Sequence, residues 1–150
     1  MQDANYKMKK PNKQLIGIDL FAGAGGLSLG AEMAGISMRY AVEADTYAAA
    51  SYKRNFKNAT VFCEDIRKLS ADSLNTQPVF IIMGGPPCQG FSLSNTKTRD
   101  MSNPNNRMFE EFLRFVDKIA PTWFVFENVY GLTKFKNGEE NIQNLSLIHI

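Results

Sequence analysis

Short apolar runs alternate with helix-like segments along this chain. Buried strands are predicted at 15–20, 38–42, 60–62, 79–83 and 122–126, and helices at 27–34 and about 46–56. A third helix is predicted at 109–120, because Phe109, Phe112 and Val116 fall on one helical face and Pro121 ends it. Gly35 marks the end of the first helix, and Asp45 or Thr46 caps the start of the second.

This alternation over short connections predicts an α/β fold with a doubly wound, mostly parallel, Rossmann-like sheet and helices on both faces. In such sheets ligands bind outside the carboxyl ends of the strands, where the strand order reverses. The first, fourth and fifth strands are neighbours in the doubly wound order. We therefore expect the residues that follow these strands to share one pocket, within about 10 Å of one another.

A glycine-rich segment, DLFAGAGG, joins the first strand to the first helix. Glycines at this point let the backbone approach a ligand closely, and Glu43, after the second strand, is placed to accept from a ribose diol. Ser28 stands where a dinucleotide fingerprint needs glycine, and Asp19 would add negative charge near phosphates. A cationic nucleoside such as S-adenosylmethionine suits this segment better than NAD. A glycine turn with a packing role only is the remaining alternative.

The fourth strand runs into Gly84-Gly85-Pro86-Pro87, and Cys88 follows. Two glycines and two prolines make a stiff loop, which can expose a thiol in a crevice and hold it as the thiolate. Cys88 is therefore a candidate nucleophile. Cys63, between Phe62 and Glu64, is expected to be a small core residue.

Glu127 comes directly after the apolar run TWFVF of the fifth strand. We expect partial desolvation there, which would raise the pKa of its carboxyl and allow it to donate a proton at neutral pH. A solvated glutamate at the start of a loop is the alternative.

Composition narrows the function class. With 44% apolar and 21% charged residues, the chain has enough core-forming material to fold. Two cysteines without a CxxC pair and one histidine, His149, exclude a disulfide framework and a zinc cluster, so no metal is expected. His149 is also poorly placed to serve as the base of a Cys-His hydrolase.

The net charge of +2 belongs to the first 13 residues, which hold four lysines and one aspartate. The rest of the chain has 13 basic and 14 acidic residues, so any surface that binds a polyanion is local or lies outside this chain. Asp19 and several glycines interrupt the apolar stretch at 15–31, which is too short to cross a bilayer. We expect a cytoplasmic protein without a membrane partner.

Three segments, DLFAGAGGLSLG (19–30), GGPPCQGFS (84–92) and ENV (127–129), closely resemble the first, fourth and sixth motifs of cytosine-5 DNA methyltransferases, and in the same order. Residues 15–136 look like the amino-terminal portion of that catalytic domain. The resemblance implies an enzyme that transfers a methyl group from S-adenosylmethionine to carbon 5 of a flipped cytosine in duplex DNA, through a covalent cysteine adduct. Restriction-modification systems use such enzymes. We expect a monomer, associated with the nucleoid if the source is bacterial.

The resemblance also assigns roles to residues. It places Cys88 as the nucleophile and Glu127 as the acid that contacts the target base. The cofactor-binding residues that it implies are Asp19, Phe21, Gly23, Glu43, Asp65, Ile66 and Pro87. The substrate-binding residues are Gln89, Phe91, Ser92 and Asn128, with Arg99 and Arg107 as candidates for contact with the DNA backbone.

The family's later paired-arginine motif and target-recognition region do not occur before residue 150. We therefore interpret 1–13 as a basic flexible tail and 14–150 as the amino-terminal part of a larger catalytic domain, with a sheet that is incomplete at its C-terminal end. The alternatives are a tRNA cytosine-5 methyltransferase, a truncated fragment without catalytic activity, and an NAD-dependent dehydrogenase.

Overall fold

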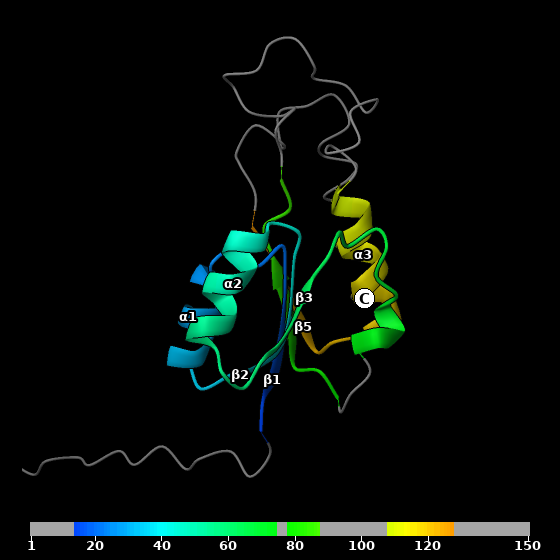
Figure 1. Ribbon diagram of the computed structural model, residues 1–150. Helices are drawn as coiled ribbons and strands as arrows, with labels where there is room; N and C mark the ends of the chain where they lie inside the picture. The colour runs from blue at the N-terminus through cyan, green and yellow to red at the C-terminus, as the bar shows by residue number, and fades with distance from the viewer. Residues whose placement is uncertain (1–13, 75–77, 88–107, 128–150) are drawn as a thin grey trace, which may run out of the picture.

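The computed structural model describes residues 14–74, 78–87 and 108–127, which form one parallel sheet with helices on both faces (Figure 1). The five strands pair in the order β3-β2-β1-β4-β5, and every pair is parallel. Their bounds are Ile16–Leu20 (β1), Ser37–Glu43 (β2), Thr60–Cys63 (β3), Ile81–Gly84 (β4) and Trp123–Phe126 (β5). The order reverses between β1 and β4, so the predicted doubly wound sheet is confirmed.

The helices divide between the two faces of the sheet (Figure 1). Helices α1 (Gly26–Met33) and α2 (Thr46–Asn55) cover one face, and α3 (Met108–Ile119) with the short 3-10 helix η1 (Ala71–Leu74) covers the other. Only η1 has no counterpart in the sequence prediction. Connections of this kind carry the chain across alternate faces and leave the carboxyl ends of the strands open.

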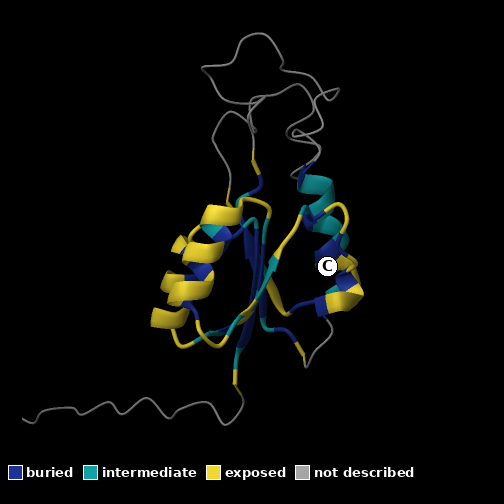
Figure 2. Cartoon of the chain, viewed as in Figure 1, coloured by how far each residue is buried: buried dark blue, intermediate teal, exposed yellow. Residues whose placement is uncertain are grey.

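Side chains on each strand alternate between the two helical layers. Ile18 and Leu20 pack under Phe112 of α3, in the larger core, whereas Ala41 packs under Tyr52 of α2 in a smaller one. Figure 2 shows the buried residues concentrated in the sheet and on the helix faces that cover it. Asp19 lies between Ile18 and Leu20 in β1, so its side chain points to the α1 and α2 layer.

The predicted helix boundaries hold to within one or two residues. The Asp45 side chain accepts hydrogen bonds from the backbone N–H groups of Tyr47 and Ala48, at 3.0 and 2.8 Å, and so caps α2. Gly35 has a φ of 86°, which suits the turn that follows α1.

The outer strands of the described sheet are β3 and β5. The prediction of a core Cys63 is wrong: this residue ends β3, which lies at the edge of the sheet, and its side chain is exposed. At the opposite edge of the described sheet, Trp123 and Val125 of β5 are 61% and 44% exposed. No helix among the described residues is long and apolar enough to cross a membrane.

Candidate functional site

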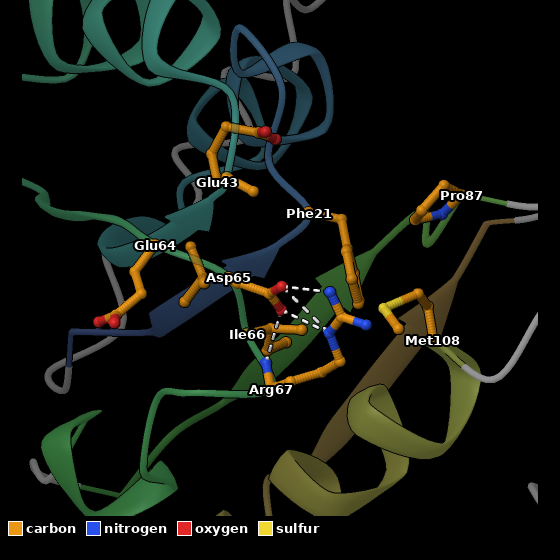
Figure 3. Close-up of a pocket in the computed structure, with 11 residues that line it drawn as sticks. Phe21, Glu43, Glu64, Asp65, Ile66, Arg67, Pro87 and Met108 are labelled. Carbon is orange, nitrogen blue, oxygen red and sulfur yellow. Dashed lines mark hydrogen bonds and ion pairs between the residues drawn. The ribbon is translucent and has the colours of Figure 1, made fainter. Parts of the chain in front are cut away.

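A cleft of about 340 Å³ opens at the carboxyl ends of the strands, beside the point where the strand order reverses. Its volume lies in the range of sites that bind small organic ligands, roughly 300–1,000 Å³. Figure 3 shows the side chains that surround it. They are Phe21, Val42, Glu43, Ala44, Glu64, Asp65, Ile66, Arg67, Gly85, Pro87 and Met108.

The glycine-rich loop forms one wall of the cleft and is tied to Glu43. One carboxylate oxygen of Glu43 accepts from the backbone N–H of Gly23 at 2.7 Å, and the other accepts from that of Asp45 at 2.7 Å. Each oxygen keeps a further lone pair for a ligand hydroxyl. Phe21 has a φ of 60°, a conformation that is costly for a residue with a side chain and often occurs at functional sites.

Asp65 and Arg67, which also line the cleft, form an ion pair. The Arg67 Nε lies 2.9 and 3.0 Å from the two Asp65 carboxylate oxygens, and a terminal guanidinium nitrogen also donates to Asp65. These hydrogen bonds lower the pKa of Asp65 to about 2, so its carboxyl is ionised at neutral pH. Arg67 was not predicted from the sequence, because a charged residue in a loop is most often solvated.

Arg114 of α3 anchors the segment that carries Asp65 and Ile66. Its guanidinium donates to the backbone carbonyls of Ile66 and Leu69, at 2.8 and 3.1 Å. Glu111, one helical turn before it, pairs with Arg114 at 2.7 Å. This wall of the cleft is therefore held by the helix on the far face of the sheet, a connection that no motif in the sequence indicates.

The lining chemistry suits a cationic nucleoside. Phe21, Val42 and Ile66 offer apolar surface to a purine ring, whereas carboxylates come from Glu43, Glu64 and Asp65. Arg67, the only basic residue among the described lining residues, is already paired with Asp65. A phosphate group would find no free cation in this part of the cleft. No group of three or more His, Cys, Asp or Glu side chains able to hold a metal ion occurs in the described ranges.

Most of the predicted cofactor residues lie at the cleft. Phe21, Glu43, Asp65, Ile66 and Pro87 line the cleft. Gly23 is adjacent, through its hydrogen bond to Glu43.

Asp19 lies elsewhere, because it has no exposed surface and does not line the cleft. Its Oδ2 accepts from the Ser28 hydroxyl at 2.6 Å, and Ser28 in turn lies 2.6 Å from the Tyr52 hydroxyl. Asp19, predicted as a cofactor-binding residue, is therefore not among the residues that line the cleft: its carboxyl is held beneath the glycine-rich loop.

Glu127 lies at the end of β5, next to the end of β4. Its backbone N–H donates to the Gly84 carbonyl at 3.0 Å, and a methyl group placed on Gly85 would come within 2.6 Å of the Glu127 Oε2. The predicted meeting of these two strand ends is confirmed. The predicted desolvation of Glu127 is wrong, because its side chain is exposed at the edge of the described sheet.

Several predicted site residues lie outside the described residues. These are Cys88, Gln89, Phe91, Ser92, Arg99, Arg107 and Asn128. The structure describes the chain up to Pro87, which lines the cleft and directly precedes the predicted nucleophile in the sequence. Gly85, Val42, Ala44, Glu64 and Met108 are lining residues that sequence reasoning missed, and only Gly85 belongs to a segment that it had singled out.

Residues 15–147 match the family described as C-5 cytosine-specific DNA methylase. The chain is 46% identical over 121 residues to the type II methyltransferase M.DdeI of Desulfomicrobium norvegicum, covering 79% of this chain and 29% of that protein. It is 42% identical over 128 residues to the type II methyltransferase M.XorII of Xanthomonas oryzae pv. oryzae, covering 81% and 30%.

Among solved structures, the fold is similar to a protein described as a DNA modification methyltransferase encoded within a prophage of E. coli. The TM-score is 0.74 and the sequence identity 36%, and the match covers 90% of this chain and 37% of that one. The chain thus spans about a third of the length of the relatives that it matches.

Proposed function

Because this chain belongs to the family of C-5 cytosine-specific DNA methylases, we propose that the protein transfers a methyl group from S-adenosylmethionine to carbon 5 of cytosine in duplex DNA. One observation carries the proposal. Gly85 both lines the nucleoside-sized cleft and lies against the carboxyl of Glu127. A donor of methyl groups in the cleft and a base held by Glu127 would therefore be neighbours, at the end of the strand that leads to Cys88.

S-adenosylmethionine, when bound, supplies an electrophilic methyl group on a sulfonium centre. We assign Phe21 and Ile66 to the faces of its adenine, and the ionised Asp65 to the adenine amino group. Glu43 would accept from the ribose hydroxyls with the lone pairs that its two backbone partners leave free. The carboxylates that line the cleft would also stabilise the positive charge of the sulfonium.

The remaining chemistry is assigned to two side chains. Carbon 5 of cytosine is a poor nucleophile, so the Cys88 thiolate adds to carbon 6 and makes carbon 5 electron-rich. Glu127 is assigned to contact ring nitrogen 3, where a proton donated from its carboxyl stabilises the charge that this addition pushes into the ring. Carbon 5 would then take the methyl group, with S-adenosylhomocysteine as the thioether that leaves. A base removes the proton from carbon 5, and the thiolate of Cys88 leaves carbon 6.

A base within a duplex cannot reach this site, so the cytosine must be flipped out of the stack. Gln89, Phe91, Ser92 and Asn128 are proposed to contact the flipped base and the adjoining DNA, and Arg99 and Arg107 the phosphate backbone. Residues 14–150 carry 13 basic and 14 acidic residues, so we propose that much of the DNA-binding surface lies outside this chain. In this proposal 1–13 is a basic tail, and 14–150 is the amino-terminal part of the catalytic domain.

Transfer of tritiated methyl groups from S-adenosylmethionine to duplex DNA by the full-length protein tests the proposal. Cys88→Ala should abolish transfer, whereas Cys63→Ala is the matched control, because Cys63 is exposed and does not line the cleft. Glu127→Gln should retain DNA binding and lose roughly 10² in rate if it stabilises charge in the ring. Undiminished transfer by Cys88→Ala would refute the mechanism.

The same assay separates the alternative substrates. Label that enters tRNA but not duplex DNA would identify a tRNA methyltransferase. If calorimetry showed that the protein binds NAD and not S-adenosylmethionine, the result would identify a dehydrogenase instead. A flat calorimetric trace for the 150-residue chain with S-adenosylmethionine would support the alternative of an incomplete fold for that fragment.

A further inference from the structure

Three polar side chains from three different elements meet beneath the glycine-rich loop. Asp19 comes from β1, Ser28 from α1 and Tyr52 from α2, and none has exposed surface. The Ser28 hydroxyl donates to Asp19 Oδ2 at 2.6 Å, and its oxygen lies 2.6 Å from the Tyr52 hydroxyl. Tyr52 and Ser28 therefore form a chain of hydrogen bonds that ends on a buried carboxyl.

This carboxyl is in an unusual environment. Its neighbours in register are Ala41 of β2 and Met83 of β4, neither of which can donate a side-chain hydrogen bond. Asp19 Oδ1 is buried and has no hydrogen-bond partner among the described residues. A buried carboxyl with a single side-chain donor is costly, so natural structures rarely keep one without a function.

The network supports the loop that forms the wall of the cleft. Ser28 lies in the first turn of α1, three residues after Gly25. The φ of 99° at Gly25 turns the chain into the helix. The rings of Tyr52 and Phe56 pack so closely against Gly25 that an added methyl group would overlap Phe56 and come within 3.0 Å of Tyr52. On its other side the loop carries Phe21 into the cleft.

We propose that Tyr52 is a positioning residue for the cofactor: through Ser28 and Asp19, its hydroxyl holds the loop from Phe21 to Gly25 in the shape that binds the nucleoside. The inference rests on the proposed function, because it deepens the account of the same site. Tyr52 does not line the cleft, and its effect reaches the ligand through the loop alone.

The protonation of Asp19 and Tyr52 depends on their burial and on the charged groups around them. The charged groups that act on the network are acidic: Glu43 of β2 raises the pKa of Asp19, and Asp19 and Glu32 of α1 raise the pKa of Tyr52. Burial, with a smaller contribution from Glu43, raises the pKa of Asp19 to about 6, against the lowering effect of Ser28. Burial also raises the pKa of Tyr52 well above its usual range, so its hydroxyl keeps its proton and can donate to Ser28.

The hydrogen bonds of the network therefore depend on the proton of Asp19. The ionised carboxylate accepts from Ser28, which then accepts from Tyr52, so all donors point toward Asp19. Protonation near pH 6 removes that order. Cofactor affinity should accordingly fall as the pH drops below about 6. Ser28→Ala should move this fall to higher pH, because Ser28 lowers the pKa of Asp19.

Tyr52→Phe in the full-length protein tests the proposal, since it removes one hydroxyl and keeps the ring that packs against Gly25. We expect the KM for S-adenosylmethionine to rise roughly five- to tenfold, with kcat changed less than twofold, because the network acts on binding. Tyr47→Phe is the matched control: it lies on the same helix, its side chain is 84% exposed, and it should leave KM unchanged.

Ser28→Ala is the second variant, and the pH dependence of cofactor binding is the second measurement. The inference would be overturned if Tyr52→Phe had the same KM as the wild type, or if Ser28→Ala left the pH at which cofactor affinity changes where it is. Methyl transfer by the wild type would still support the proposed function in either case. Absence of both cofactor binding and methyl transfer in the wild type would overturn the two together.

Discussion

Replacement of Gly25 by alanine should destabilise the protein more than replacement of any other glycine in the same loop. Gly25 has φ 99° and ψ 29°, a region where an L side chain costs about 1–2 kcal/mol. The added methyl group would also overlap the ring of Phe56, which is 6% exposed and packs against Tyr52 with ring centroids 4.4 Å apart. Overpacking of this kind costs about 1–3 kcal/mol.

The two costs together predict a loss of about 2–5 kcal/mol for Gly25→Ala. Gly23→Ala separates them, because Gly23 has a φ of 54° but its methyl group would meet nothing within 4 Å. Only the backbone cost, about 1–2 kcal/mol, applies there. Gly26→Ala adds a methyl group in open space in the first turn of α1, so it should be neutral or stabilise by up to about 1 kcal/mol.

Urea unfolding of the three variants and the wild type, followed by circular dichroism, measures these differences from the midpoints at a common slope. The order of stability should be Gly26→Ala, then Gly23→Ala, then Gly25→Ala. If Gly25→Ala lost no more than Gly23→Ala, the Phe56 ring would have to move at no cost, and the close packing of α2 against the loop would be refuted.

Three further predictions concern charges. Asp45→Ala removes the two hydrogen bonds that cap α2 and should lower the free energy of unfolding by about 1 kcal/mol; an unchanged thermal midpoint would contradict this. The pKa of Asp19 rises from 3.8 when unfolded to about 6 in the folded protein, so the folded state binds more protons in this window. Stability should therefore fall by about 2 kcal/mol as pH rises from 4 to 6, and Asp19→Asn should remove that slope in urea titrations at each pH. Arg67→Ala should return the pKa of Asp65 from about 2 toward 3.8, as an NMR titration of its carboxyl carbon would show; an unmoved value would mean that Arg67 is not its cause.

Much of the fold follows from local features of the sequence. The run VFIIM is apolar throughout, as strands covered on both faces are, and Asp45 caps a helix through bonds to residues two and three positions on. The doubly wound order then places the ends of β1, β4 and β5 side by side, because parallel strands need crossovers of one hand. These features let the sequence predict where the cleft lies and that Glu43 lines it, whereas Phe21, Asp65, Ile66 and Pro87 were predicted from the resemblance to the family.

Burial and long-range pairing were decided only by the tertiary structure. Cys63 and Glu127 have apolar neighbours in the sequence, yet both are exposed, because each ends an edge strand of the described sheet. Asp19 has the reverse fate, since its place in the central strand points it under two helices.

The hydrogen bond that joins Ser28 to Tyr52 spans 24 positions, and the one from Arg114 to Ile66 spans 48. Neither has a local signature, because a polar side chain is stabilised by whichever partner packing brings within about 3 Å. The sequence by itself thus determined the succession of elements and the strand ends that carry the chemistry. The packing of α1, α2 and α3 on the two faces of the sheet decided which polar groups are buried, which are paired, and how the walls of the cleft are held.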